Sequence, residues 1–110
     1  MMTEDVKKQF DKIKVGDILV GSFHYTMSFY DFFEVKAKTA SSLRIQKLKK
    51  EPCGSSGFME PNVRPVIGKY DGDIVLRRPD HFGVITEDSM RIHIDNIYDP
   101  KSVYAEDHWD

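Results

Sequence analysis

The chain has 110 residues, enough for one domain, and its 40% hydrophobic and 12% aromatic content exclude a disordered chain. Its formal net charge of −2 gives no sign of nucleic-acid binding through bulk electrostatics, for which a basic chain is expected. The charge is nevertheless uneven. Residues 1–55 carry ten Lys and Arg against seven Asp and Glu (+3), and residues 56–110 carry six against eleven (−5). This asymmetry leaves open a basic and an acidic side of the folded surface.

The single cysteine, Cys53, excludes an intrachain disulfide, which is typical of a protein from a reducing compartment. The first fourteen residues are charged throughout, unlike a signal peptide. No apolar run approaches the roughly 18 residues that a membrane-spanning helix needs. We therefore expect a cytoplasmic protein that does not contact a membrane.

Residues 1–14 are predicted to hold a short helix. Thr3 is a favourable N-cap, and the apolar residues Val6, Phe10 and Ile13 recur at helical spacing to give one apolar stripe. A helix of this length persists only when it is docked, so we expect Phe10 to be buried against a sheet.

Residues 15–48 are predicted to form a three-stranded antiparallel meander. From Asp17 onward the hydrophobic pattern has a period of two, and short polar turns divide it into strands. The second strand, Phe29–Lys38, ends in a clean alternation of apolar and charged residues, and the third is Leu43–Leu48. Gly21 in the first strand indicates a β-bulge or a close approach of another segment.

Residues 49–62 contain two prolines and two glycines and are predicted to be a long loop. Further strands are expected within residues 63–95, and the first of them is a short edge strand broken by Pro65. Residues 96–110 are expected to form an acidic tail.

Together these elements predict a single, mainly β domain over residues 1–110. We expect a small curled antiparallel sheet, or a partly open barrel of the SH3-like or OB-like kind, with a short N-terminal helix. The alternative is a flatter α+β sheet with the helix lying across one face.

The sequence contains no recognisable catalytic or cofactor motif. Gly-rich phosphate loops, CxxC pairs, HExxH and GxSxG elements are absent. His93 and Asp95 are the only local pair that resembles metal ligands, and two ligands do not make a site. The sequence therefore predicts a protein that is not an enzyme and binds neither a metal nor a cofactor.

The most informative stretch is the aromatic run Ser22–Val35, which places six aromatic residues on two paired strands. A sheet has two faces and the run supplies both, so one aromatic face must belong to the core. The other face is either covered by the helix and the tail or open for stacking or for a partner. The candidate contact residues on and beside an open face are His24, Tyr25, Tyr30, Asp31, Phe32, Arg44 and Lys47.

Two charged features of this region have a structural and a functional interpretation. A buried Asp31 would be costly without a hydrogen-bond partner. We therefore favour a structural carboxylate bonded to Ser22, His24 or a backbone amide over one that faces a ligand. The strongest basic cluster consists of Arg44, Lys47, Lys49 and Lys50. It fits a solvated strand end and loop better than a phosphate-binding patch.

Short motifs in the chain resemble those of small uncharacterised proteins carried by bacteriophages and other mobile elements. Residues 16–18 read GDI, residues 22–25 read SFHY and residues 31–35 read DFFEV, where those proteins read GDI, SWGYDQTN and DFYQV. Residues 63–66 and 98–104 are similar to their VxPV and WDGKPxY elements. The second motif and the turn after it depart from the pattern. The resemblance implies a mobile-element accessory protein in a bacterial host, and it brings no catalytic residues.

Two functions from different classes follow. The leading hypothesis is a non-enzymatic binding protein of phage or mobile-element origin that occupies a host protein, for example as an inhibitor of a host defence system. The alternative is a nucleotide or single-stranded nucleic-acid binding module that stacks bases on the aromatic face. The near-neutral net charge favours a protein partner. The oligomeric state is left open.

Overall fold

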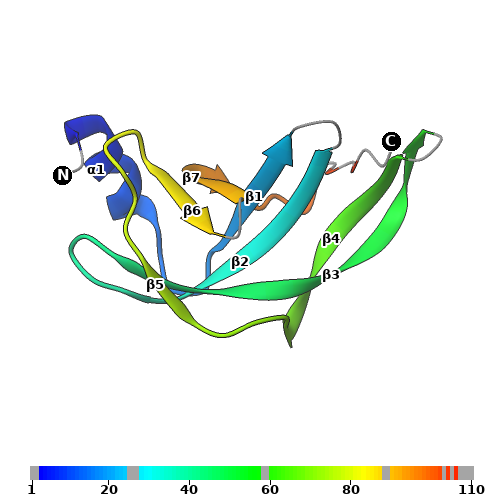
Figure 1. Ribbon diagram of the computed structural model, residues 1–110, viewed down its shortest axis with the longest axis horizontal. Helices are drawn as coiled ribbons and strands as arrows, with labels where there is room; N and C mark the ends of the chain where they lie inside the picture. The colour runs from blue at the N-terminus through cyan, green and yellow to red at the C-terminus, as the bar shows by residue number, and fades with distance from the viewer. Residues whose placement is uncertain are drawn as a thin grey trace.

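The computed structural model describes residues 3–24, 28–57, 60–87, 90–102, 104 and 106, which form one helix and seven strands (Figure 1). In chain order these are α1 (Glu4–Lys12), β1 (Ile18–His24), β2 (Ser28–Lys38), β3 (Leu43–Gly57), β4 (Glu60–Tyr70), β5 (Val75–Arg77), β6 (Val84–Glu87) and β7 (Met90–Ile97). The antiparallel sheet has the order β4-β3-β2-β1-β7-β6, and β5 pairs with β3. The predicted mainly β fold with a short N-terminal helix is confirmed, and the sheet does not close into a barrel.

Polar contacts hold both ends of α1. At the N-terminus, the Thr3 hydroxyl oxygen accepts a hydrogen bond from the Val6 N–H at 3.3 Å. At the C-terminal end, Lys38 Nζ on β2 donates to the carbonyl oxygens of Phe10 (2.8 Å) and Ile13 (2.9 Å). Phe10 is fully buried, so the predicted helix and its docking are confirmed.

The two faces of the sheet carry separate hydrophobic cores. Helix α1 covers one core, and the segment that contains Tyr98 and Tyr104 covers the other. The helix-side core consists of Val6, Phe10, Ile13, Leu19, Phe33, Val35, Leu43, Ile45, Ile85, Ile92 and Ile94. The tail-side core consists of Val20, Phe32, Leu48 and Val63, with Ile18, Tyr30, Tyr70, Tyr98 and Tyr104 packed against it. Neighbours along a strand point to opposite faces, so the adjacent residues Phe32 and Phe33 enter different cores.

Gly21 on β1 lies close to two side chains of the helix-side core, Phe33 and Ile92. The pairing of β1 with β7 shifts register between Leu19 and Gly21, which is the bulge that the sequence predicted. A Cβ atom at Gly21 would lie 2.9 Å from Phe33 Cε2 and 3.1 Å from Ile92 Cγ1. Both of the features predicted for this glycine, a bulge and a close approach, are therefore present.

The prediction of a loop over residues 49–62 is wrong. Strand β3 runs to Gly57 and β4 begins at Glu60, and together they form a long hairpin that extends from the body of the sheet (Figure 1). The hairpin pairing shifts register at three places, which accommodates residues that usually interrupt strands. Because β4 ends the strand order, Pro61 and Pro65 lie on an edge strand, where proline is tolerated.

The sheet stays open between β5 and β6. Strand β6, which the sequence pattern does not predict, pairs with β7, whereas β5 pairs with β3. Within the described residues no hydrogen-bonded ladder joins β5 to β6. An ion pair between Arg77 Nε and Glu87 Oε2, at 2.6 Å, spans this open seam. The seam is the reason that the curled sheet is not a closed barrel.

Candidate functional site

Strands β1 and β2 form the predicted hairpin and carry the aromatic run. Their register pairs Val20 with Phe32 and Ser22 with Tyr30. Phe32 is fully buried in the tail-side core, and its neighbour Phe33 is buried in the helix-side core. At Phe32 and Phe33 both faces of the hairpin are therefore internal, whereas Phe23 and Phe29, nearer its tip, are half-buried. Phe32, predicted as a candidate contact residue, is instead a core residue because its side chain has no exposed surface.

The tail segment (residues 98–102, 104 and 106) covers the face that carries Phe32. Tyr98 and Tyr104 meet the Phe32 ring edge to face, with ring centroids 5.4 and 5.5 Å away, and Tyr104 meets Tyr30 in the same way at 5.7 Å. This geometry is favourable because the positive edge of one ring faces the negative face of another. Burial raises the pKa of the Tyr98 phenol above its usual value. The chain's own tail thus occupies the aromatic surface.

The tail segment also pairs with the outer edge of β4. The Val63 N–H donates to the Tyr104 carbonyl oxygen and the Glu106 N–H donates to the Pro61 carbonyl oxygen, each at 2.9 Å. Val63 pairs with Tyr104 and Pro61 pairs with Glu106, so β4 and the tail segment run antiparallel. An edge strand with unpaired backbone groups can recruit another chain, and the tail protects this part of β4 from that.

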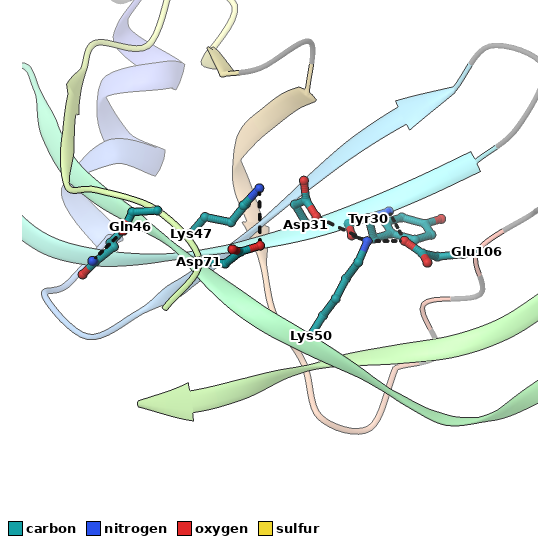
Figure 2. Close-up of polar contacts among 8 residues, drawn as sticks. Tyr30, Asp31, Gln46, Lys47, Lys50, Asp71 and Glu106 are labelled. Atoms are coloured by element: carbon teal, nitrogen blue, oxygen red, sulfur yellow. Dashed lines mark hydrogen bonds and ion pairs between the residues drawn. The ribbon is translucent and has the colours of Figure 1, made fainter. Parts of the chain in front are cut away.

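An ion cluster anchors the tail to β2 and β3 (Figure 2). Lys50 Nζ lies 2.6 Å from Glu106 Oε2 and 3.3 Å from Asp31 Oδ1, and it donates to the Tyr30 carbonyl oxygen at 2.7 Å. Glu106 Oε2 also accepts from the Tyr30 N–H at 3.0 Å, and the Glu106 side chain is only 5% exposed. A carboxylate this buried is tolerated because it is paired and hydrogen-bonded. Asp31 was expected to bond to Ser22, His24 or a backbone amide; its ionic partner is Lys50, on the part of β3 that was predicted to be a loop.

The predicted basic cluster divides into paired and unpaired residues. Lys47 Nζ lies 3.8 Å from Asp71 Oδ2, and Lys50 belongs to the ion cluster (Figure 2). Arg44 and Lys49 are exposed and form no ion pair with another described residue. Of the two basic residues predicted to contact a partner, Lys47 therefore has its charge partly offset by Asp71, whereas Arg44 can form an ion pair with a partner.

Two further candidate contact residues lie at the end of the β1–β2 hairpin. Tyr25 is outside the described residues. The backbone of His24 ends β1 and pairs with Ser28, but its side chain is outside the described part of the chain. Among the predicted residues, the structure therefore brings together Tyr30 and Asp31, which meet at the ion cluster through Lys50.

The outer face of β3 and β5, opposite the helix-side core, presents apolar residues to solvent. Ile45 and Val75 pair across these strands and contribute to the helix-side core, so the next pair, Arg44 and Leu76, points outward. Ile74, two residues before Leu76, is 49% exposed, and Leu76 is 44% exposed. We call Arg44, Ile74 and Leu76 the β3–β5 patch. Its apolar members, Ile74 and Leu76, are not predictable as surface residues from the sequence, because a branched residue in a strand is typical of a core.

A second exposed apolar side chain stands on the turn before β6. Phe82 is exposed and its ring lies beside that of His81, with centroids 4.0 Å apart. The turn is ordered by Asp80 Oδ1, which accepts from the N–H groups of Phe82 (2.8 Å) and Val84 (3.0 Å). The hydrogen bond from Val84, and then the one from Phe82, favours the charged carboxylate and holds the pKa of Asp80 below its usual 3.8.

No group of three His, Cys, Asp or Glu side chains among the described residues could hold a metal ion. None of the helical residues described forms a segment long and apolar enough to cross a membrane. Comparison of the chain with protein-family models, with curated proteins and with solved structures found no match. The arguments about function therefore rest on the surface of this chain.

Proposed function

We propose that this chain is a non-enzymatic binding protein of phage or mobile-element origin, which acts by occupying a host protein through the β3–β5 patch. The observation that carries the proposal is the pair of Arg44 and Leu76, which lie side by side on the outer face with Ile74 next to them. Contiguous exposed apolar surface marks interaction sites on soluble proteins, and arginine is enriched in them.

Arg44 is the patch residue of a type that is common in binding hot spots. A few residues carry most of the binding energy in protein interfaces, and arginine is among the types that do so most often. Arg44 has no ionic partner among the described residues, so binding would not first have to break an ion pair. The neighbouring backbone is held by the ladder of β5 on β3, so the patch is presented on a regular strand pair.

The charges and rings favour a protein partner over nucleic acid. Single-stranded nucleic acid is bound by exposed aromatic rings beside free basic groups. In this chain Phe32 is buried, Tyr30 is packed by Tyr104, and Lys47 and Lys50 already face carboxylates. A host defence nuclease is one class of protein that such a binder could occupy, and inhibition would follow from blocking its surface.

The test is capture of a host protein from bacterial lysate by the tagged chain. We expect one stoichiometric partner, and Leu76→Asp and Arg44→Glu should each lower its recovery on the order of ten-fold, as loss of a hot-spot residue does. The matched control is Ile67→Asp on β4, where the side chain is 67% exposed and lies outside the patch. Thermal unfolding of each variant confirms that it is folded. Recovery of no partner, or equal recovery with Leu76→Asp and wild type, would contradict the proposal.

A further inference from the structure

A small cavity opens at the seam between β5 and β6. Its volume is about 210 Å³, and its apolar floor is formed by Phe33 of β2 and Val75 of β5. The polar wall includes Lys47, Asp73 and Glu87. Small-molecule sites usually begin near 300 Å³. This cavity is therefore of a size to receive one amino-acid side chain rather than a larger ligand.

The lining of the cavity is negatively charged. Three carboxylates, those of Asp71, Asp73 and Glu87, face one ammonium group, that of Lys47, which gives a formal charge of −2. Counting Arg77, the ion-pair partner of Glu87, leaves −1. The excess of negative charge over an apolar floor favours a ligand that carries a cation on an apolar stem.

Unused acceptors are present on this wall. Asp73 forms no ion pair with any described residue, and Lys47 lies 3.8 Å from Asp71, longer than a close hydrogen-bonded pair (Figure 2). The Glu87 side chain is only 14% exposed, and one of its two carboxylate oxygens accepts a hydrogen bond from Arg77 Nε. A guanidinium group has five N–H donors and an ammonium group has three, and carboxylates are their strongest acceptors.

We propose that this cavity receives a basic side chain, arginine or lysine, from the protein that the β3–β5 patch contacts. The segment before and within β5 serves both surfaces, because Asp73 and Val75 face the cavity while Ile74 and Leu76 face outward. The two surfaces lie on opposite sides of β5, so a partner that covers the patch reaches the cavity around the edge of β5 at the seam. That the basic side chain belongs to a partner protein rests on the proposed function. That the cavity prefers a cation does not.

The experiment titrates the isolated chain with N-acetyl-arginine amide, followed by amide chemical shifts in NMR spectra. N-acetyl-lysine amide is a second arm and distinguishes the two cations. N-acetyl-citrulline amide, the uncharged isostere of the arginine probe, is the ligand control. We expect binding on the order of millimolar for the better cation, with shifts at residues 71–75, 47 and 87, and at least about three-fold weaker binding of citrulline.

Asp73→Asn tests the wall, and Asp95→Asn is its matched control. Asp95 is exposed near the end of β7, whereas Glu87 pairs with Met90 at the start of that strand. We expect Asp73→Asn to weaken the cation about three-fold, the usual size for one partly exposed charge, and Asp95→Asn to leave it unchanged. Equal binding of citrulline, shifts elsewhere, or no effect of Asp73→Asn would overturn the inference. Because this test uses no partner, its failure leaves the result of the capture experiment intact.

Discussion

The helix-side core and the tail-side core lie on opposite faces of the same strands, but they are built from different chemistry. Apart from two phenylalanines, the buried residues of the helix-side core are aliphatic, and a helix covers them. The tail-side core is flanked by four tyrosines and is closed by an irregular segment that a buried carboxylate anchors. This difference in chemistry follows from what covers each core, a helix on one face and the tail segment on the other. A helix supplies its own backbone hydrogen bonds, whereas an extended segment must find them on neighbouring strands and polar groups.

This comparison predicts that the two cores respond differently to disruption, one by global unfolding and the other by local opening. Disruption of the helix-side core should destabilise the whole sheet, because that core joins α1, β1, β2, β3, β6 and β7. Disruption of the tail anchor should first release the tail segment, because local opening follows the contacts that hold each part. Phe33→Ala and Glu106→Gln test this difference directly. Gly21→Ala tests the packing of the helix-side core, and Asp80→Asn tests a turn outside both cores. The four predictions follow from the largest expected effect to the smallest.

Phe33→Ala in the helix-side core should have the largest effect. Removing a buried phenyl ring costs about 3–5 kcal/mol of unfolding free energy, through lost burial and the cavity left behind. Urea denaturation measures the change, and Phe82→Ala, which removes an exposed ring, should change stability by less than about 0.5 kcal/mol. Equal effects of the two variants would show that Phe33 is not part of a core.

Glu106→Gln should release the tail with a smaller loss of stability. Breaking one side of a buried ion pair costs about 3–5 kcal/mol. The Lys50 side chain is 30% exposed and keeps Asp31 as a second partner, so we expect about 2 kcal/mol. In hydrogen exchange, the amides of Glu106 and of Val63, which pairs with the tail, should exchange faster while the Ile92 amide stays protected. Uniform acceleration of all three amides would contradict a separate tail-side unit.

Gly21→Ala tests the packing between β1 and β7. The added methyl group would meet the Phe33 ring at 2.9 Å and the Ile92 side chain at 3.1 Å, so a neighbour must move. We expect a loss of about 1–2 kcal/mol in urea denaturation, as overpacking usually gives. Ala40→Ser, on an exposed turn, is the control and should be neutral. A neutral Gly21→Ala would show that the strands approach less closely than described.

Asp80→Asn should have the smallest effect and a defined pH dependence. Hydrogen bonds from Val84 and Phe82 lower the pKa of Asp80 in the folded state, so its charged form stabilises folding above the unfolded pKa. That contribution is lost as the pH falls through the lower folded pKa. The carboxylate is exposed, so wild type should exceed the variant by less than about 1 kcal/mol at pH 6. The difference should narrow at pH 3, and a constant difference at both values would contradict it.

The strands and the helix that follow a local pattern could be predicted from the sequence. The stripe of Val6, Phe10 and Ile13 and the cap at Thr3 are properties of neighbouring residues, and so is the bulge signal of Gly21. The prediction failed at residues 49–62, because proline and glycine usually interrupt strands. The edge strand was predicted only from residue 63 onward, whereas β4 begins at Glu60. There a proline nitrogen facing outward removes no hydrogen bond.

The elements that decide the site depend on distant contacts. Asp31 had a predictable need for a partner, but Lys50 reaches it only because β3 continues past Leu48. Glu106 lies in an acidic tail that is typical of a solvated segment, and nothing near it in the sequence indicates burial. The exposure of Ile74 and Leu76 likewise depends on the pairing of β5 with β3, which turns Val75 toward the core. For these residues, the tertiary arrangement overrides the local pattern.

The central claim is that a partner is contacted by the β3–β5 patch and not by the aromatic run, in which Phe32 and Phe33 are buried on opposite faces. The most direct measurement is photo-crosslinking in bacterial lysate with p-benzoylphenylalanine placed at Leu76, at Ile67 or at Phe32. We predict one dominant adduct from position 76, none from the exposed control position 67 and none from the buried position 32. An adduct that forms from position 32 or 67 but not from position 76 would contradict the claim.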